Sequence, residues 1–399
     1  MLKIIHNKYS YFLLVVLAIF LLAFFVLPNI FGPVVIGGEK NNKEAGVIPP
    51  VVKKVVQHVK TPNSVKAIYM SACVAATPSF RDRLVKLIDE TELNSVVIDI
   101  KDYSGTISFE INSPGFENHS GGGCRVADMA GFIENLHNKN IYVIGRITAF
   151  QDAYMTKKHP DWAVKKKTDK TLVWKDRKGI SFIDAGNKDM WQFLVDLGKA
   201  SYEIGFDELN FDYIRFPSDG DMSDIYFPHS NNVLIQYSTS TIPGKSVVLK
   251  NFFEFIHDNF KDTDIVTSAD IFGMTTINYD DLNIGQVLED AAPNFDYIAP
   301  MVYPSHFPPG FLNYKTVAEV NAHPYEIIKY TMGEAVKRLS IIGISPLKLR
   351  PWLQDNDYPV TYTPAMVRAQ IQATYDVGLT SWMLWDAGNT YTKEALNTI

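Results

Sequence analysis

Apolar runs of strand length alternate with amphipathic helical stretches from residue 65 to the end of the chain. The strand-like runs are Ala67–Val74, Ser95–Ile100, Ile141–Ala149, Glu208–Phe216, Ile265–Phe272, Tyr297–Tyr303, Leu349–Gln354 and Ser381–Asp386. The helical patterns between them are Ser79–Thr91, Val126–Lys139, Lys188–Gly205, Val247–Phe260, Ile284–Ala291, Tyr325–Ile342 and Pro364–Gly378. Nearly continuous apolar strands, each followed by a helix, indicate a parallel sheet that is covered on all sides. Eight such strands in roughly 330 residues predict an α/β fold closed into a (β/α)8 TIM barrel.

Two polar segments interrupt this alternation, and both follow the ends of predicted strands. They are Tyr154–Ile183 and Ser218–Thr241. The first contains the run Lys165–Lys167, which we interpret as part of a solvated hairpin. Because barrels carry their sites at the carboxyl ends of the strands, both insertions are expected beside the site.

The N-terminal region has a different composition from the rest of the chain. Lys3 and Lys8 precede the uncharged apolar run Tyr11–Leu27, whose length is close to what a bilayer requires. We therefore predict a cytoplasmic tail (1–10), a transmembrane signal anchor (11–31), a flexible linker (32–64) and a barrel domain (65–399) outside the cytoplasm. If the apolar segment were cleaved as a signal peptide, the protein would be secreted and the barrel would lie on the same side.

Charge and composition exclude several classes of partner and cofactor. The net charge of −6 and the lack of a basic stripe with interleaved aromatics argue against nucleic acid. The run Gly121–Gly123 lacks the Lys-Ser/Thr of a phosphate loop, and no dinucleotide motif follows a strand. With scattered histidines and no CxxC or HExxH, we predict no metal and no cofactor. Cys73 and Cys124 suit an exported protein and could form a disulfide, although their spacing does not require one.

Polar side chains at the predicted strand ends supply the candidate chemistry. The segment Gly205–Gly220 places Asp212 in an otherwise buried strand, where an ionised carboxylate needs a partner or a use. In a barrel such side chains converge on one pocket, and acids, Arg and aromatic rings together suit a carbohydrate. The candidates for substrate binding are Asp99, Asp102, Arg146, Asn210, Tyr213, Arg215, Tyr303, His306, Trp352, Gln354, Asp355 and Trp385.

Glycoside hydrolysis needs two carboxyl groups, one as acid and one as nucleophile or base. We predict that these are Asp212 and Asp270, at the ends of the fourth and fifth strands. Asp99, Asp102 and Asp355 are further candidates for the two carboxyl groups. Arg215 or Arg146 could keep Asp212 ionised or bind the substrate. The structural alternative is that Arg215 pairs with Asp212 or Asp207 and only fastens a loop.

Five motifs occur in order along the chain: VVIDIKDYSG (Val96–Gly105), FDELNFDYIRFPSDG (Phe206–Gly220), SADIFG (Ser268–Gly273), YIAPMVYPSHF (Tyr297–Phe307) and PWLQD (Pro351–Asp355). From about Val65 onward the chain resembles the bacterial family described as a "putative glycosyl hydrolase domain". The resemblance implies a TIM barrel of glycosidase ancestry. Asp212 and Asp270 also occupy the places of the alpha-amylase carboxylates, whereas Ile214 stands where chitinases carry their catalytic Glu.

Two functions from different classes follow. The first is a membrane-tethered glycoside hydrolase that acts on a cell-envelope or extracellular polysaccharide. The alternative is a non-catalytic carbohydrate-binding barrel, and other chemistry on the same scaffold is a third reading. The sequence leaves open whether hydrolysis would retain or invert the anomeric configuration, because this depends on the distance between the carboxyl groups.

Overall fold

Eight parallel strands form a closed barrel in the computed structural model, which describes residues 56–116, 119 and 124–398. Around the barrel the strand order is β1-β10-β9-β8-β7-β5-β3-β2. The strands are β1 (Lys66–Met70), β2 (Ser95–Lys101), β3 (Tyr142–Thr148), β5 (Glu208–Asp212), β7 (Val266–Phe272), β8 (Tyr297–Met301), β9 (Trp352–Gln354) and β10 (Trp382–Trp385). Each coincides with one of the eight predicted runs, so the predicted (β/α)8 barrel is confirmed.

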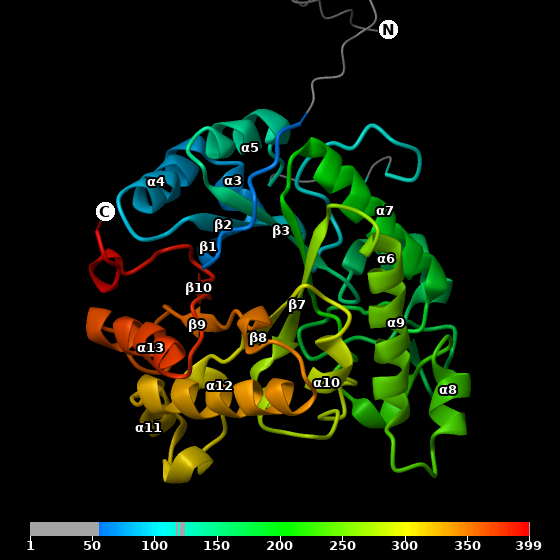
Figure 1. Ribbon diagram of the computed structural model, residues 1–399. Helices are drawn as coiled ribbons and strands as arrows, with labels where there is room; N and C mark the ends of the chain where they lie inside the picture. Colours follow the sequence, from blue (N-terminus) through cyan, green and yellow to red (C-terminus); the bar gives the residue numbers. More distant parts are fainter. Residues whose placement is uncertain (1–55, 117–118, 120–123, 399) are drawn as a thin grey trace, which may run out of the picture. The chain divides into compact units, whose positions relative to one another are not determined.

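Helices surround the strands (Figure 1). They are α3 (Ala72–Ala75), α4 (Pro78–Asp89), α5 (Met129–His137), α6 (Ala153–Lys158), α7 (Lys188–Ile204), α8 (Asn231–Gln236), α9 (Gly244–Phe260), α10 (Leu288–Ala291), α11 (Val317–Asn321), α12 (Pro324–Ile341) and α13 (Pro364–Asp376). The seven predicted helices correspond to α4, α5, α7, α9, α10, α12 and α13.

Side chains alternate between the two faces of each strand and so contribute to two separate apolar cores. A small core inside the barrel includes Tyr69, Ile144 and Trp352, and a larger one lies between the strands and the helices. In β5, Leu209 and Phe211 belong to the outer core. Because side chains alternate along a strand, Glu208, Asn210 and Asp212 point into the barrel. The polar residues of this strand therefore form part of the barrel interior.

Several observed strands are shorter than the predicted runs, and for two of them the local reason is clear. The first ends at Met70, because the Ser71 side chain accepts a hydrogen bond from Val74 N and caps α3. The fourth, β5, ends at Asp212, because Tyr213 adopts a left-handed φ of 51°. Residues other than glycine rarely adopt this backbone conformation. At Tyr213 it turns the chain sharply out of the sheet directly after Asp212.

The two insertions contact each other. Strand β4 (Lys165–Lys166) of the first pairs antiparallel with β6 (Ile225–Tyr226) of the second. Trp174 Nε1 also donates to the Asp221 carbonyl at 2.9 Å. Lys165 is buried in this small sheet, so the lysine run is less solvated than predicted.

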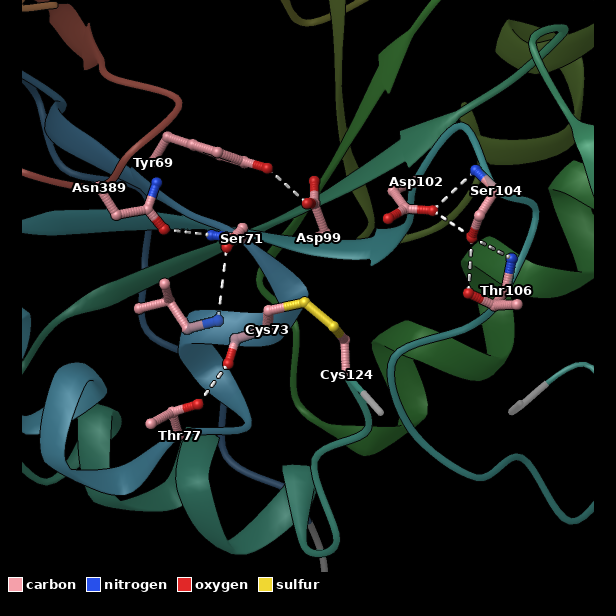
Figure 2. The surroundings of a disulfide bond; sticks show 11 residues. Tyr69, Ser71, Cys73, Thr77, Asp99, Asp102, Ser104, Thr106, Cys124 and Asn389 are labelled. Carbon is pink, nitrogen blue, oxygen red and sulfur yellow. Dashed lines mark hydrogen bonds between the residues drawn. A yellow bond between two sulfur atoms is a disulfide. The ribbon is translucent and has the colours of Figure 1, made fainter. Parts of the chain in front are cut away.

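A disulfide joins Cys73 of α3 to Cys124, which precedes α5 (Figure 2). The two cysteines are 51 residues apart in sequence. The bridge fastens the segment after β1 to the end of the long connection after β2. It therefore ties together two connections at the carboxyl ends of neighbouring strands.

Removing this bridge is expected to destabilise the barrel. For a loop of 51 residues the chain-entropy relation gives a loss of about 4 kcal/mol in the free energy of unfolding. The measurement is urea unfolding of Cys73→Ala/Cys124→Ala beside the oxidised parent, with the reduced parent as control. A double variant as stable as the oxidised parent would contradict the prediction.

Residues 56–64 lie against the amino ends of the barrel strands. Val59 N donates to Asp207 Oδ1 at 2.8 Å, and Thr61 Oγ1 lies 3.0 Å from Tyr142 Oη. The predicted tail, the apolar segment 11–31 and the linker as far as residue 55 lie outside the described residues. Among the helices that the structure describes, none is both long and apolar enough to cross a membrane.

Candidate active site

Strand register gathers polar side chains inside the carboxyl-terminal half of the barrel. Across β2, β3, β5 and β7, four successive register partners form a partial ring: Asp99, Arg146, Asn210 and Ser268. Asp212 and Asp270 lie two residues further along β5 and β7. The two carboxyl groups predicted from sequence therefore stand on adjacent strands, one level above this ring.

Arg146 lies at the centre of the cluster and binds two carboxylates. Its Nη1 donates to Asp99 Oδ1 at 2.7 Å, and its Nε donates to Asp212 Oδ2 at 2.9 Å, with a further bond from Nη2 to the same oxygen. Burial opposes the charge on Arg146, but the two carboxylates outweigh it and raise the pKa of the guanidinium above its ordinary value. The three side chains thus form a buried ionic triad.

Tyr69, at the end of β1, completes the environment of Asp99. Its hydroxyl donates to Asp99 Oδ2 at 2.6 Å, and Figure 2 shows the two groups facing each other. Burial raises the pKa of Asp99, although Arg146 and Tyr69 both oppose the rise. Both oxygens of Asp99 are therefore engaged by protein donors.

Asp212 receives hydrogen bonds at both of its oxygens. Besides the Arg146 bonds to Oδ2, the backbone N–H of Tyr213 donates to Oδ1 at 2.6 Å. The left-handed conformation of Tyr213 costs about 1–3 kcal/mol. Both oxygens of Asp212 are therefore engaged by protein donors.

Asp270 has the opposite environment. It is 1% exposed, and Oδ1 accepts from Asn210 Nδ2 at 2.9 Å and from Trp352 Nε1 at 2.8 Å. Burial and then the negative charge of Asp212 raise the pKa of Asp270 well above its ordinary value, and Arg146 opposes them. The surroundings of Asp270 therefore favour its protonated form.

Aromatic rings line the opposite side of the barrel interior. Tyr69 stacks on Trp385 with ring centroids 4.3 Å apart, and Trp352 meets Trp385 edge-on at 5.7 Å. The Arg146 guanidinium lies 5.6 Å from the ring centroids of both Tyr69 and Trp385. Trp385 is half-buried, so part of its surface is open at the mouth. The site has an acidic half on β2, β3, β5 and β7 and an aromatic half on β1, β9 and β10.

Tyr303 and His306 follow β8 and extend the aromatic half. Their ring centroids are 5.1 Å apart, and Tyr303 lies 6.2 Å from Trp385. Burial and the charges of Asp270 and Asp212 raise the pKa of Tyr303 well above its ordinary value. Tyr303 is therefore a neutral phenol, while His306 is exposed.

Two further candidates, Asp102 and Gln354, are engaged in shaping loops. Asp102 Oδ1 accepts from Ser104 N at 2.8 Å in the turn after β2 (Figure 2). Gln354 binds the backbone of Ser305, Asn356 and Tyr358 through its amide.

Arg215 points away from the carboxylates. Its Nη1 donates to the Phe216 carbonyl at 3.1 Å and to Ser218 Oγ at 3.2 Å, and its guanidinium lies 5.2 Å from the centroid of the Tyr213 ring. Asp207 lies at the other end of β5, where its oxygens contact His58, His137 and two backbone N–H groups. The structural alternative, in which Arg215 pairs with Asp212 or Asp207, is therefore wrong.

Asp355, after β9, is held by one residue. Thr392 donates to it through its backbone N at 2.9 Å and through Oγ1 at 2.6 Å. Burial raises the pKa of Asp355 to about 6, against the effect of these two bonds. Asp355 thus fastens the segment after β10 at the mouth of the barrel.

Sequence reasoning missed three side chains of the cluster: Tyr69, Thr148 and Ser268. Tyr69 binds Asp99, and Ser268 Oγ accepts from Asn210 Nδ2 at 3.0 Å. Thr148 is the register partner of Asp212, and its buried Oγ1 has no hydrogen-bond partner among the residues that the structure describes. Counting alternate residues along the predicted strands would have placed all three inside the barrel.

Residues 67–391 match the model of the family described as "putative glycosyl hydrolase domain", and the chain belongs to this family. No curated protein matches the chain.

Two solved structures that align with a TM-score of at least 0.5 share the fold. The glycoside hydrolase domain of PgaB (BpsB) from Bordetella bronchiseptica aligns with a TM-score of 0.55 and 13% identity, over 82% of this chain and 94% of that one. The alpha-galactosidase TtGalA from Thermus thermophilus gives 0.50 and 11%, over 84% and 60%. A hypothetical protein from Ruminiclostridium thermocellum ATCC 27405 is 26% identical, with a TM-score of 0.42, over 50% and 96%.

Proposed function

We propose that this member of the glycosyl hydrolase domain family hydrolyses glycosidic bonds of a cell-envelope or extracellular polysaccharide. In this proposal Asp270 is the general acid and Asp212 is the nucleophile or the base. The observation that carries it is the contrast between two carboxyl groups on adjacent strands. Asp212 is bound by a guanidinium and a backbone N–H, whereas burial and the charge of Asp212 raise the pKa of Asp270. Pairs of carboxyl groups in opposite environments are typical of glycosidases.

The reaction needs a proton from Asp270 and either an electron pair or proton uptake from Asp212. Asp270 donates its proton to the glycosidic oxygen, which takes the electron pair of the breaking C–O bond. Asp212 either attacks the anomeric carbon or removes a proton from the water that attacks it. In the first course a covalent glycosyl intermediate forms on Asp212, and water that gives its proton to the ionised Asp270 then breaks this bond. The configuration of the first sugar released, measured by NMR, distinguishes the two courses.

The aromatic half of the site supports a sugar as the substrate. The half-buried Trp385 offers a ring face for the C–H groups of a pyranose, and the exposed His306 can bind a hydroxyl at the rim. The polar groups of Asp99 are engaged by Arg146 and Tyr69. Asp99 therefore stabilises the charge of Arg146 and does not bind the sugar.

We place the barrel outside the cytoplasm. The Cys73–Cys124 disulfide supports this proposal, because such bonds persist in oxidising compartments. The apolar run Tyr11–Leu27 is the proposed membrane anchor. A substrate in the cell envelope or beyond it follows from this location.

The test is sugar release from a panel of envelope and extracellular polysaccharides by the parent protein and Asp270→Asn. We expect one polymer class to be cleaved by the parent, and the rate to fall about 10²- to 10⁴-fold without the acid. With nitrophenyl glycosides the rate should fall less in Asp270→Asn, because their leaving group departs with little protonation.

Folding of the variant is checked by its thermal unfolding, and binding is measured on the same panel. Binding to a polymer without release, unchanged in Asp270→Asn, would contradict the proposal. That result would identify a carbohydrate-binding barrel without catalysis.

A further inference from the structure

Asp270 uses only one of its two oxygens for hydrogen bonds within the described residues. Asn210 Nδ2 and Trp352 Nε1 both donate to Oδ1, at 2.9 and 2.8 Å, and neither bond goes to Oδ2. Asn210 and Trp352 are each 1% exposed, so water does not compete for these bonds. The two oxygens of this carboxyl group are therefore not equivalent.

We infer that Trp352 and Asn210 are positioning residues, which keep Oδ1 of Asp270 as the acceptor and so confine the catalytic proton to Oδ2. This inference rests on the proposed function, in which Asp270 is the acid. A carbonyl oxygen has two lone pairs, and two donors occupy both. A proton on Oδ1 would have to displace one of them. The proton of the neutral acid therefore lies on the oxygen that these two bonds leave unused.

The indole is the more decisive of the two donors. An indole N–H can only donate, so Oδ1 accepts from Trp352 whichever way the Asn210 amide is turned. As placed, Asn210 donates to both Ser268 Oγ and Asp270, and its own Oδ1 is buried without a partner among the described residues. A buried carbonyl oxygen that accepts no hydrogen bond is energetically unfavourable. Asn210 nevertheless has the amide orientation in which its Nδ2 donates to Asp270 and its Oδ1 is left without a donor. Both side chains were predicted to bind substrate, but their N–H groups are already engaged.

The hydrogen bonds from Asn210 and Trp352 also limit how far the pKa of Asp270 is raised. Burial and Asp212 raise the pKa of Asp270, while Arg146 and the bonds from Asn210 and Trp352 lower it. The other ionisable group that faces Asp270 is Tyr303, whose own pKa is raised well above its ordinary value, so it stays neutral. Removing one donor should therefore raise the pKa of Asp270 further, since the ionised form loses a hydrogen bond.

The experiment follows the titration of the Asp270 carboxyl group by infrared or carbon-13 NMR spectroscopy, assigned by its loss in Asp270→Asn. We expect Trp352→Phe to raise the apparent pKa by about one unit, the equivalent of a tenfold change in proton affinity. Asn210→Ala should shift the titration in the same direction and serves if Trp352→Phe does not fold. The matched control is Trp382→Phe, because Trp382 Nε1 donates at 2.9 Å to Tyr375 Oη in the outer layer of the barrel. Its Asp270 titration should equal that of the parent.

Where the parent is active, its pH profile gives a second readout. Activity depends on protonated Asp270 and is lost as the pH rises through its pKa. A higher pKa therefore moves the alkaline limb of kcat to higher pH in Trp352→Phe, with KM little changed and no movement in Trp382→Phe. An Asp270 titration equal in parent, Trp352→Phe and Asn210→Ala overturns the inference. Because this spectroscopic result needs no substrate, it is independent of whether the proposed hydrolysis is found.

Discussion

Asp212→Asn is expected to reduce the rate of polysaccharide hydrolysis at least about 10³-fold, because it removes the charge that acts at the anomeric carbon. The amide is similar in size to the carboxylate, and Arg146 retains its bond to Asp99. Folding should therefore be close to normal. The measurement is kcat on the polymer found in the panel, beside the free energy of unfolding in urea.

The matched control for Asp212→Asn is Asp207→Asn, an equally buried acid just before the same strand. Asp207 accepts from Val59 N and Val143 N at the amino ends of the barrel strands, far along the strand direction from the site. Asp207→Asn should lose stability but keep activity within a few-fold. Equal rates in Asp212→Asn and the parent would remove Asp212 from the mechanism, whereas an unfolded Asp212→Asn would assign it a structural role.

The fold could be predicted because each strand of a covered parallel sheet is a nearly continuous apolar run. The errors are local and have identifiable causes. The first strand was extended to Val74, although Ser71 has the side chain of a helix cap. The fourth was extended to Phe216, because the left-handed turn at Tyr213 has no sequence signal such as Gly or Asn.

The partners of the site residues could be predicted less well. The sequence offers Arg215, only three residues away, and Arg146 as partners for Asp212. Arg146 is the partner, because the register between β3 and β5 sets it beside Asn210 and Asp212 inside the barrel. Register between distant strands depends on packing of the whole barrel, which no local pattern encodes.

Trp352 illustrates the same limit. Its position at a strand end suggested stacking on a sugar, which is a property of the ring. What the structure adds is the direction of one N–H bond, across two strands to Asp270. The identity of a residue indicates which interactions it can make, and the fold selects among them.

Arg146→Met is expected to lower the free energy of unfolding by about 3–5 kcal/mol at neutral pH, the usual cost of leaving buried charges without their partner. Arg146 is 6% exposed, and its guanidinium is the cation bound to both Asp99 and Asp212. Methionine fills part of the space but compensates neither carboxylate. Hydrolysis should be lost as well, because Arg146 is the side chain that holds the Asp212 carboxylate in place.

The pH dependence of this loss identifies its electrostatic origin. Burial already raises the pKa of Asp99, and removing Arg146 raises it further. A group whose pKa is raised on folding contributes stability at low pH and loses it as the pH rises through the folded-state value. Urea unfolding should therefore show a small difference between Arg146→Met and the parent near pH 4 and the full difference above neutrality.

Arg350→Met is the matched comparison, because Arg350 binds Glu208 at 2.7 Å inside the same barrel, at the opposite end from the site. Both variants should lose stability at neutral pH, since each leaves a buried carboxylate unpaired. Only Arg146→Met should lose hydrolysis below its unfolding temperature, because only Arg146 contacts Asp212. If Arg146→Met loses as much stability at pH 4 as at pH 8, packing accounts for the effect. The buried ionic triad would then contribute nothing to the stability of the barrel.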